Sequence, residues 1–352
     1  MVYRIWVIKE DDMPNCLRGS RDLDYLHLTE DEITFLDQNL PSYHAMGGHT
    51  DMAGLCNELG MDIQRKVAVI PNTIYRNKEP SLGEEVTRKL RDLQKTCDLL
   101  SIRFNPDVVR GKTSVETLFN ISNYYMGILG DFPEKEFGSG VIERSGDRRL
   151  KPYIEEIRRL YGDDIAIEVF GSFWSSDNND VDARVYRNEF SVDDYNILER
   201  SDVFYVDGIP LGPQVMPRDI GRKLRGYNLD AGIETENKRI VFGDIDLPIL
   251  KEDDVKTLLM IQIGDYILRT REETYMEWIR ENLLPGTTIN KIRGRLKTPH
   301  LIYKWLKHSY DSIPEPPPKT DISRMGEADV LEEMIRVNVY YSQLAQRLKE
   351  PI

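Results

Sequence analysis

The hydrophobic positions of this chain follow two periods, and each predicts a different kind of element. Short apolar runs between turn-forming residues predict strands, at residues 3–8, 66–70, 165–170, 181–186, 203–206 and 239–250. Apolar residues that recur every three or four positions predict helices, two of them preceded by a capping Ser or Thr with Glu three residues later. These helices lie at residues 81–100, 113–130, 150–161 and 191–200, with a further helical start at Thr29.

The pattern changes along the 352 residues in a way that predicts three regions. Residues 131–148 are rich in Gly and charge, which is typical of a connection. After residue 253 long helical stretches replace the strands, and a stiff proline-rich linker at 314–318 precedes a final amphipathic helix at 329–349. We therefore expect an α+β protein with an accessory α/β region at 1–149, a mixed-sheet core at 150–250 and a helical domain at 251–352.

Composition narrows the setting in which the protein works. Three widely spaced cysteines indicate a reducing compartment rather than a disulfide framework. The sequence contains no run of eighteen apolar residues, so no membrane span is predicted. The N-terminus becomes acidic too early for a signal peptide. We expect a cytoplasmic protein with no membrane partner. The net charge of −13 opposes non-specific nucleic-acid binding and favours a small substrate or a protein partner.

One stretch, residues 170–186 (FGSFWSSDNNDVDARVY), combines features that suit phosphate chemistry. The strand-like run before it leads into Gly171 and Ser172, where backbone N–H groups and a hydroxyl can approach a phosphate closely. Asp180 and Asp182 open the next strand, and their spacing places both carboxylates on one face. Neighbouring carboxylates repel unless a cation lies between them, and Mg²⁺ or Mn²⁺ prefers such oxygen ligands. The stretch predicts metal-dependent phosphoryl or nucleotidyl transfer.

These residues resemble the polymerase-β-like nucleotidyltransferase superfamily, in which Gly-Ser follows a strand and Asp-x-Asp opens the next. The resemblance covers the middle third of the chain. It implies a nucleotidyltransferase-like mixed-sheet core in which Gly171 and Ser172 hold the phosphates of a nucleoside triphosphate such as ATP. Asp180 and Asp182 would bind Mg²⁺ or Mn²⁺. The implied transferase moves a nucleoside monophosphate to a hydroxyl and releases pyrophosphate, with an RNA or DNA end, a protein or a small molecule as acceptor.

The same resemblance implies a third carboxylate on a later strand. Asp244 and Asp246, in the run at 239–250, are the preferred candidates for catalysis, and Asp244 also for metal binding. Asp207, after the run at 203–206, is the competitor. The chain departs from the superfamily pattern in its short loop, which carries Ser175 and Ser176 near the position of a second glycine.

Two other functional classes stay open. Asp244 and Asp246 form a second Asp-x-Asp, which resembles the manganese site of nucleotide-sugar glycosyltransferases. That interpretation leaves Gly171, Asp180 and Asp182 unexplained. The altered glycine pattern alternatively suits a catalytically inactive nucleotidyltransferase fold that binds nucleotide or a protein.

Three further clusters invite chemical interpretations that the sequence favours less. His44, His49 and Cys56 could supply three zinc ligands, but no fourth ligand is evident. A basic cluster follows Pro217 and could steady a triphosphate or face solvent; it comprises Arg218, Arg222, Lys223 and Arg225. The basic run at 291–297 precedes aromatic residues, a combination that suits single-stranded nucleic acid or ordinary helix packing.

Overall fold

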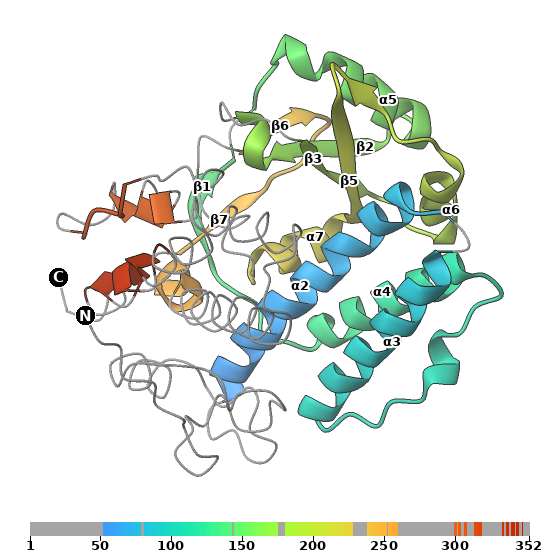
Figure 1. Ribbon diagram of the computed structural model, residues 1–352, viewed down its shortest axis with the longest axis horizontal. Coiled ribbons are helices and arrows are strands. Elements are labelled where there is room, and N and C mark those ends of the chain that lie inside the picture. Colours follow the sequence, from blue (N-terminus) through green and yellow to red (C-terminus); the bar gives the residue numbers. More distant parts are fainter. Residues whose placement is uncertain are drawn as a thin grey trace. The chain divides into compact units, whose positions relative to one another are not determined.

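The computed structural model describes residues 52–78, 81–142, 144–174, 180–227, 238–251 and 253–259, with short stretches and single positions between 299 and 347. Contacts divide the chain into two compact units, one of Cys56–Val255 and one of Met1–Leu55 with Lys256–Ile352. The first unit combines helices with a mixed sheet, so its architecture is α+β (Figure 1). The boundary predicted after residue 149 falls inside this unit.

A five-stranded mixed sheet forms the centre of the first unit, in the order β4-β5-β3-β2-β6. Its strands are β2 (Ile165–Phe170), β3 (Val181–Arg187), β4 (Tyr205–Val206), β5 (Ile209–Pro217) and β6 (Lys238–Phe242). β3 and β5 run parallel, whereas the other neighbours are antiparallel. Separately, β1 (Phe137–Val141) pairs with β7 (Pro248–Leu250) in a two-stranded sheet.

The two faces of the large sheet differ in chemistry. Alternate residues of β2 and β3 fill one face with buried apolar side chains, among them Ile167, Val169, Val181, Ala183 and Val185. Cross-strand neighbours share a face, and the register places two polar rows on the other one. These rows are Gly212–Asp182–Phe170–Lys238 and Gln214–Arg184–Glu168–Ile240. A buried polar face needs internal partners, so this face is where a site is expected.

Two helices lie against the polar face. The long helix α2 (Met52–Arg76) reaches it with its last turn, and α7 (Arg218–Arg225) packs its Gly221 against the Tyr186 ring. Figure 1 shows α2 ending beside β5, with α7 next to it. The strand predicted at residues 66–70 is wrong, because these residues lie inside α2. Pro71 follows this mainly apolar run and had suggested the end of a strand, but Pro71 also lies inside α2.

The remaining helices largely follow the sequence prediction. They are α3 (Leu82–Leu99), α4 (Ser114–Gly130), α5 (Lys151–Tyr161) and α6 (Val192–Arg200). Thr113 caps α4 by accepting a bond from the Glu116 backbone N–H, and Ser191 forms a capping box with Asp194. Ser81 precedes α3 without such a bond and instead donates to the Lys78 carbonyl. Short 3-10 turns η4 (Pro106–Val109), η5 (Arg148–Leu150) and η6 (Gly171–Trp174) complete the connections.

One further strand prediction is wrong, and one strand was not predicted. The run at 239–250 is not one strand, because Gly243 adopts φ 74° after β6 and the chain then joins a different sheet as β7. The sequence reading also missed β5, which contains three prolines. β4 covers only Ile209 and Pro210, so most of β5 is an edge strand, where proline is tolerated.

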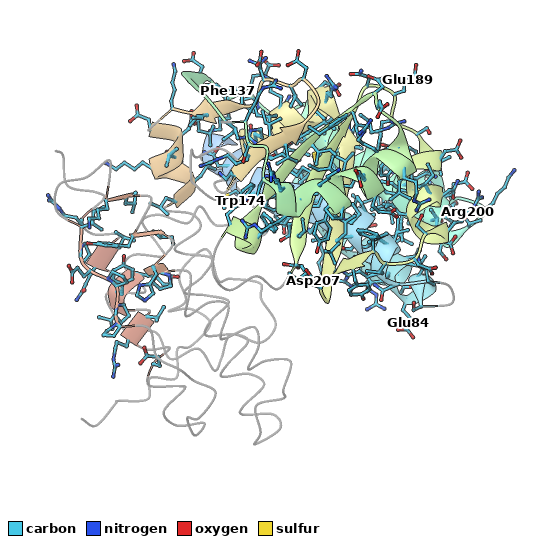
Figure 2. All side chains as sticks on the ribbon, turned by 90° about the horizontal axis from the view of Figure 1, so that it is seen from above. Glu84, Phe137, Trp174, Glu189, Arg200 and Asp207 are labelled. Atoms are coloured by element: carbon cyan, nitrogen blue, oxygen red, sulfur yellow. The ribbon has the colours of Figure 1, made fainter. Side chains whose placement is uncertain are left out.

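The surfaces of the described parts carry ordinary polar side chains. Glu84, Glu189 and Arg200 point outward from the first unit (Figure 2). Among the described residues, no helix is long and apolar enough to cross a membrane. In the second unit the described residues include a set of buried apolar side chains, namely Leu258, Leu259, Ile302, Leu306, Val337, Tyr340, Tyr341 and Leu344.

Candidate functional site

One edge of the large sheet gathers the residues that the sequence had singled out. β2 ends at Phe170, which pairs with Asp182, so Gly171 emerges beside the start of β3. Asp180 directly precedes that strand. An added Cβ at Gly171 would lie 3.3 Å from Asp182 Oδ2. The backbone turn and the carboxylate are thus immediate neighbours, as the sequence predicted.

Gly171 can make this turn because it has no side chain. Its φ is 81°, in the left-handed region that side chains disfavour. The chain then forms η6, which Trp174 fixes by donating from Nε1 to the Val169 carbonyl at 3.0 Å. The backbone of Ser172 lies in η6, whereas its side chain and residues 175–179 lie outside the described residues.

Asp182 is held in an environment that resists its negative charge. Burial raises the pKa of Asp182, the neighbouring Asp180 raises it further, and Arg184 and Arg76 offset only part of the effect, leaving it at about 6. A carboxylate in this situation gains from an additional cation nearby. The effect of Asp180 on this pKa is the repulsion between neighbouring carboxylates that the sequence led us to expect.

Arg76, the last residue of α2, is a site residue that sequence reasoning missed. Its Nη2 donates to Asp180 Oδ2 across 3.4 Å, with the two side chains 39% and 30% exposed. A long, exposed pair of this kind stabilises by only about 0–1 kcal/mol. Arg76 is thus close to the carboxylates without being locked to them.

The surroundings of Gly212 show how closely these groups converge. The position of an added Cβ there lies 3.1 Å from Asp182 Oδ1, 3.4 Å from Arg76 Nη2 and 3.6 Å from Asn72 Nδ2. Gly212 on β5 pairs with Asp182 on β3, so the side chain of any larger residue at position 212 would lie against all three groups. Asn72 also carries a buried side-chain oxygen, Oδ1, without a hydrogen-bond partner. Helix α2 and strands β3 and β5 together form a small polar site.

A buried charge network lies directly behind this site. Glu168 is fully buried and accepts bonds from Arg184 at 3.2 Å, Arg225 at 3.0 Å and the Tyr186 hydroxyl at 2.7 Å. Burial alone would raise the pKa of Glu168, but the two guanidinium groups and Tyr186 lower it to about 2. Arg184 pairs in the sheet with Glu168 and lies two residues from Asp182, so the network fixes the strand that carries the site.

The second Asp-x-Asp lies at the opposite edge of the sheet. Lys238 pairs with Phe170, whereas Phe242 pairs with Ile167 and leads away to Asp244. At about 3.3 Å per residue, this places Phe242, after which β6 ends, roughly 10 Å along the strands from the row of Phe170 and Asp182. Asp244 is 97% exposed and forms an ion pair with Arg144 at 2.6 Å. The structure does not bring Asp244 or Asp246 together with Asp180 and Asp182.

Asp207, the other candidate for a third carboxylate, lies at the same edge as Asp180. It occupies the turn before β5 with φ 51°, and β5 runs parallel to β3 from their adjacent beginnings. Figure 2 labels Asp207 and, following β2, Trp174. Asp207 is exposed. β5 itself contains no carboxylate, and the positions beside Asp182 and Arg184 are Gly212 and Gln214.

The basic clusters and the possible zinc ligands that the sequence suggested are only partly among the described residues. The basic cluster of α7 has exposed and buried members. Arg222 is exposed and lies over Phe137, whereas Arg225 is buried and binds Glu168. Arg218 donates to the Asp244 carbonyl and Lys223 to the Gly130 carbonyl. Cys56 is buried, and burial raises the pKa of its thiol. His44, His49, Cys16 and the run at 291–297 lie outside the described residues.

A cavity of about 370 Å³ lies at the Asp244 edge, lined by Arg144, Ser145, Gly146 and the β6 segment from Ile240 to Gly243. Its lining contains an arginine but no carboxylate, and Arg144 already binds Asp244. This lining does not suit a divalent cation.

The donor set at the Gly171 edge fits one divalent cation. Asp180 and Asp182 would supply two carboxylates, which are oxygen ligands of the type that Mg²⁺ and Mn²⁺ prefer. Within the described part of the chain, no group of three or more His, Cys, Asp or Glu side chains gathers as a cation site. The set is therefore small, and a bound cation would keep positions open for phosphate oxygens and water.

Comparison with known proteins adds no relative: no family model, curated protein or solved structure matches this chain.

Proposed function

We propose that this protein binds a nucleoside triphosphate with a divalent cation at Asp180 and Asp182. One observation carries the proposal. The positive-φ turn at Gly171 lies against the Asp182 carboxylate, 3.3 Å from the Cβ position to Oδ2, at an edge where Asp180 and Arg76 also meet. A backbone turn that can receive phosphates thus adjoins carboxylates that can receive a cation.

The reaction that suits this arrangement is nucleotidyl transfer to a hydroxyl, with release of pyrophosphate. A bound Mg²⁺ or Mn²⁺ would neutralise charge on the phosphate oxygens during in-line displacement. Asp180 and Asp182 would hold it, the Gly171 turn would orient the leaving phosphates, and Arg76 would add positive charge. The hydroxyl would belong to a nucleic-acid end, a protein or a small molecule.

A specific observation favours a second candidate, nucleotide binding without turnover. The resemblance implies a third carboxylate on a later strand, but β5 carries Gly212 and Gln214 beside Asp182 and Arg184, and Asp207 lies in the turn before it. A site without a third carboxylate would still bind a cation and phosphates. It would lack a group to activate the attacking hydroxyl.

The test combines binding with turnover. Each nucleoside triphosphate is added with and without Mg²⁺ or Mn²⁺, and the midpoint of thermal unfolding is recorded, since a ligand of the folded form raises its stability. We expect a metal-dependent rise for the wild type that Asp182→Asn abolishes. Asp244→Asn is the matched control, because it removes an exposed carboxylate at the far edge, and it should leave the rise unchanged.

The outcomes separate the candidates. Pyrophosphate release together with the metal-dependent rise supports nucleotidyl transfer, whereas the rise alone supports binding without turnover. The nucleotide site itself is contradicted if Asp182→Asn responds like the wild type. A response to a sugar nucleotide that Asp244→Asn abolishes would favour the glycosyltransferase alternative instead.

A further inference from the structure

The placement of Arg76 leads to an inference about how the site changes when it fills. Arg76 Nη2 lies 3.4 Å from Asp180 Oδ2 and also close to Asp182, as the Gly212 Cβ position shows. This guanidinium therefore stands where it neutralises part of the carboxylate charge. A divalent cation would bind the same oxygens and has twice the charge.

We infer that Arg76 competes with the divalent cation for the carboxylates and becomes a ligand of the phosphate chain once the nucleotide enters. The inference rests on the proposed function and adds a phosphate-binding residue to it. Its geometric basis is that the Arg76 guanidinium can reach both the carboxylates and a phosphate chain bound beside them. An exposed ion pair at 3.4 Å is weak enough to exchange, and a guanidinium suits phosphate oxygens because it donates in a planar fork.

The backbone around Arg76 is fixed on both sides, which allows the side chain to exchange partners while its base stays in place. Tyr75 is fully buried, and its hydroxyl accepts a bond from the Phe204 backbone N–H at 2.7 Å. Lys78 donates to the Leu198 and Ser201 carbonyls at 2.9 and 2.7 Å. The end of α2 is thereby tied to the segment between α6 and β4.

Charge balance explains why such a residue is useful here. A triphosphate brings several negative charges to an edge that already holds two carboxylates. β5 contributes no further carboxylate that could hold a second cation. With one divalent cation at Asp180 and Asp182, Arg76 is the side chain already in position to supply further positive charge to the phosphates.

Two binding measurements on the full chain test this inference. Free Mn²⁺ is followed by its paramagnetic resonance signal, which gives the affinity for the cation alone. Titration calorimetry then gives the affinity for inorganic tripolyphosphate in the presence of Mn²⁺. Tripolyphosphate supplies the phosphate chain without a base, so the unknown base preference does not matter.

We expect Arg76→Ala to change the two affinities in opposite directions. Mn²⁺ alone should bind severalfold more tightly, because its competitor is gone, while tripolyphosphate should bind about tenfold more weakly, as loss of one charge contact implies. Arg76→Lys, which keeps the charge but not the fork, should fall between. Arg200→Ala removes the same charge from the exposed end of α6 and should change neither affinity.

A merely structural role for Arg76 would move both affinities in the same direction, and that result, or no change, would overturn the inference. Failure of the proposed function looks different. In that case the wild type itself binds neither Mn²⁺ nor tripolyphosphate, or Asp182→Asn binds both like the wild type.

Discussion

Arg76 and Asp180 lie 104 residues apart in the sequence, yet their side chains meet at 3.4 Å at the edge of the sheet. The contact joins the end of α2 to the start of β3. It brings the end of α2, which lies within the predicted region 1–149, to the candidate site. The same helix brings Asn72 to this edge.

The raised pKa of Asp182 predicts that Asp182→Asn stabilises the metal-free protein. The folded pKa of about 6 exceeds the ordinary value of 3.8, so ionisation favours the unfolded chain. The wild type therefore loses stability as pH rises through this window, by roughly 3 kcal/mol at pH 8. Urea unfolding at pH 8 should show Asp182→Asn to be more stable by this amount, with the difference disappearing near pH 4. Equal stability at pH 8 would contradict the prediction.

Glu168 predicts the opposite effect. Its pKa of about 2 lies below the ordinary 4.5, so its charge stabilises the fold above pH 4.5 and this stabilisation is lost as pH falls towards 2. Glu168→Gln would leave Arg184 and Arg225 buried without their counter-charge, which costs about 3–5 kcal/mol. Urea unfolding at pH 7 measures this cost. Glu189→Gln, at an exposed position, should be neutral; a loss below 1 kcal/mol for Glu168→Gln would contradict the role of the network.

Local patterns in the sequence were sufficient for the elements that carry the carboxylates. The strand predictions at 165–170 and 181–186 and the helix prediction at 191–200 match β2, β3 and α6 closely. They succeed because short apolar runs and helical periodicity are patterns among near neighbours in the sequence. The closeness of Gly171 to Asp182 follows from these elements and a short loop.

Long-range relationships were beyond the sequence reading. β5 was not predicted because its three prolines argue against a strand, and the sequence does not show that most of β5 lies at the side of the sheet, where proline is tolerated. Arg76 escaped because nothing near it in the sequence marks a site, and its partner lies on a distant strand. The sequence favoured Asp244 as a third carboxylate because Asp244 and Asp246 repeat the Asp-x-Asp pattern on a later strand. The antiparallel register of β6 instead places Asp244 at the other edge of the sheet. No local pattern encodes that register.

Gly171→Ala should harm both stability and binding. A side chain at φ 81° is strained, and its Cβ would lie 3.3 Å from Asp182 Oδ2. We expect a loss of about 1–2 kcal/mol in the free energy of unfolding and a weaker metal-dependent response to triphosphate. Gly146→Ala is the control, since its Cβ would meet nothing within 4 Å. Unfolding by urea and the thermal response to nucleotide measure the two effects. An unchanged nucleotide response in Gly171→Ala would argue against phosphate binding at this turn.

Tyr75→Phe tests whether the anchored end of α2 matters for the site. The change leaves the buried segment intact but removes the acceptor of the Phe204 N–H, which costs about 1–3 kcal/mol of stability. Because Arg76 is the next residue, a looser helix end should also weaken Mn²⁺-dependent tripolyphosphate binding severalfold, while Mn²⁺ alone still binds. Calorimetry below the unfolding temperature separates the two losses. Tyr205→Phe removes a hydroxyl from a side chain that is 57% exposed and should affect neither. If Tyr75→Phe lowers stability but leaves tripolyphosphate affinity at the wild-type value, the position of Arg76 does not depend on this anchor.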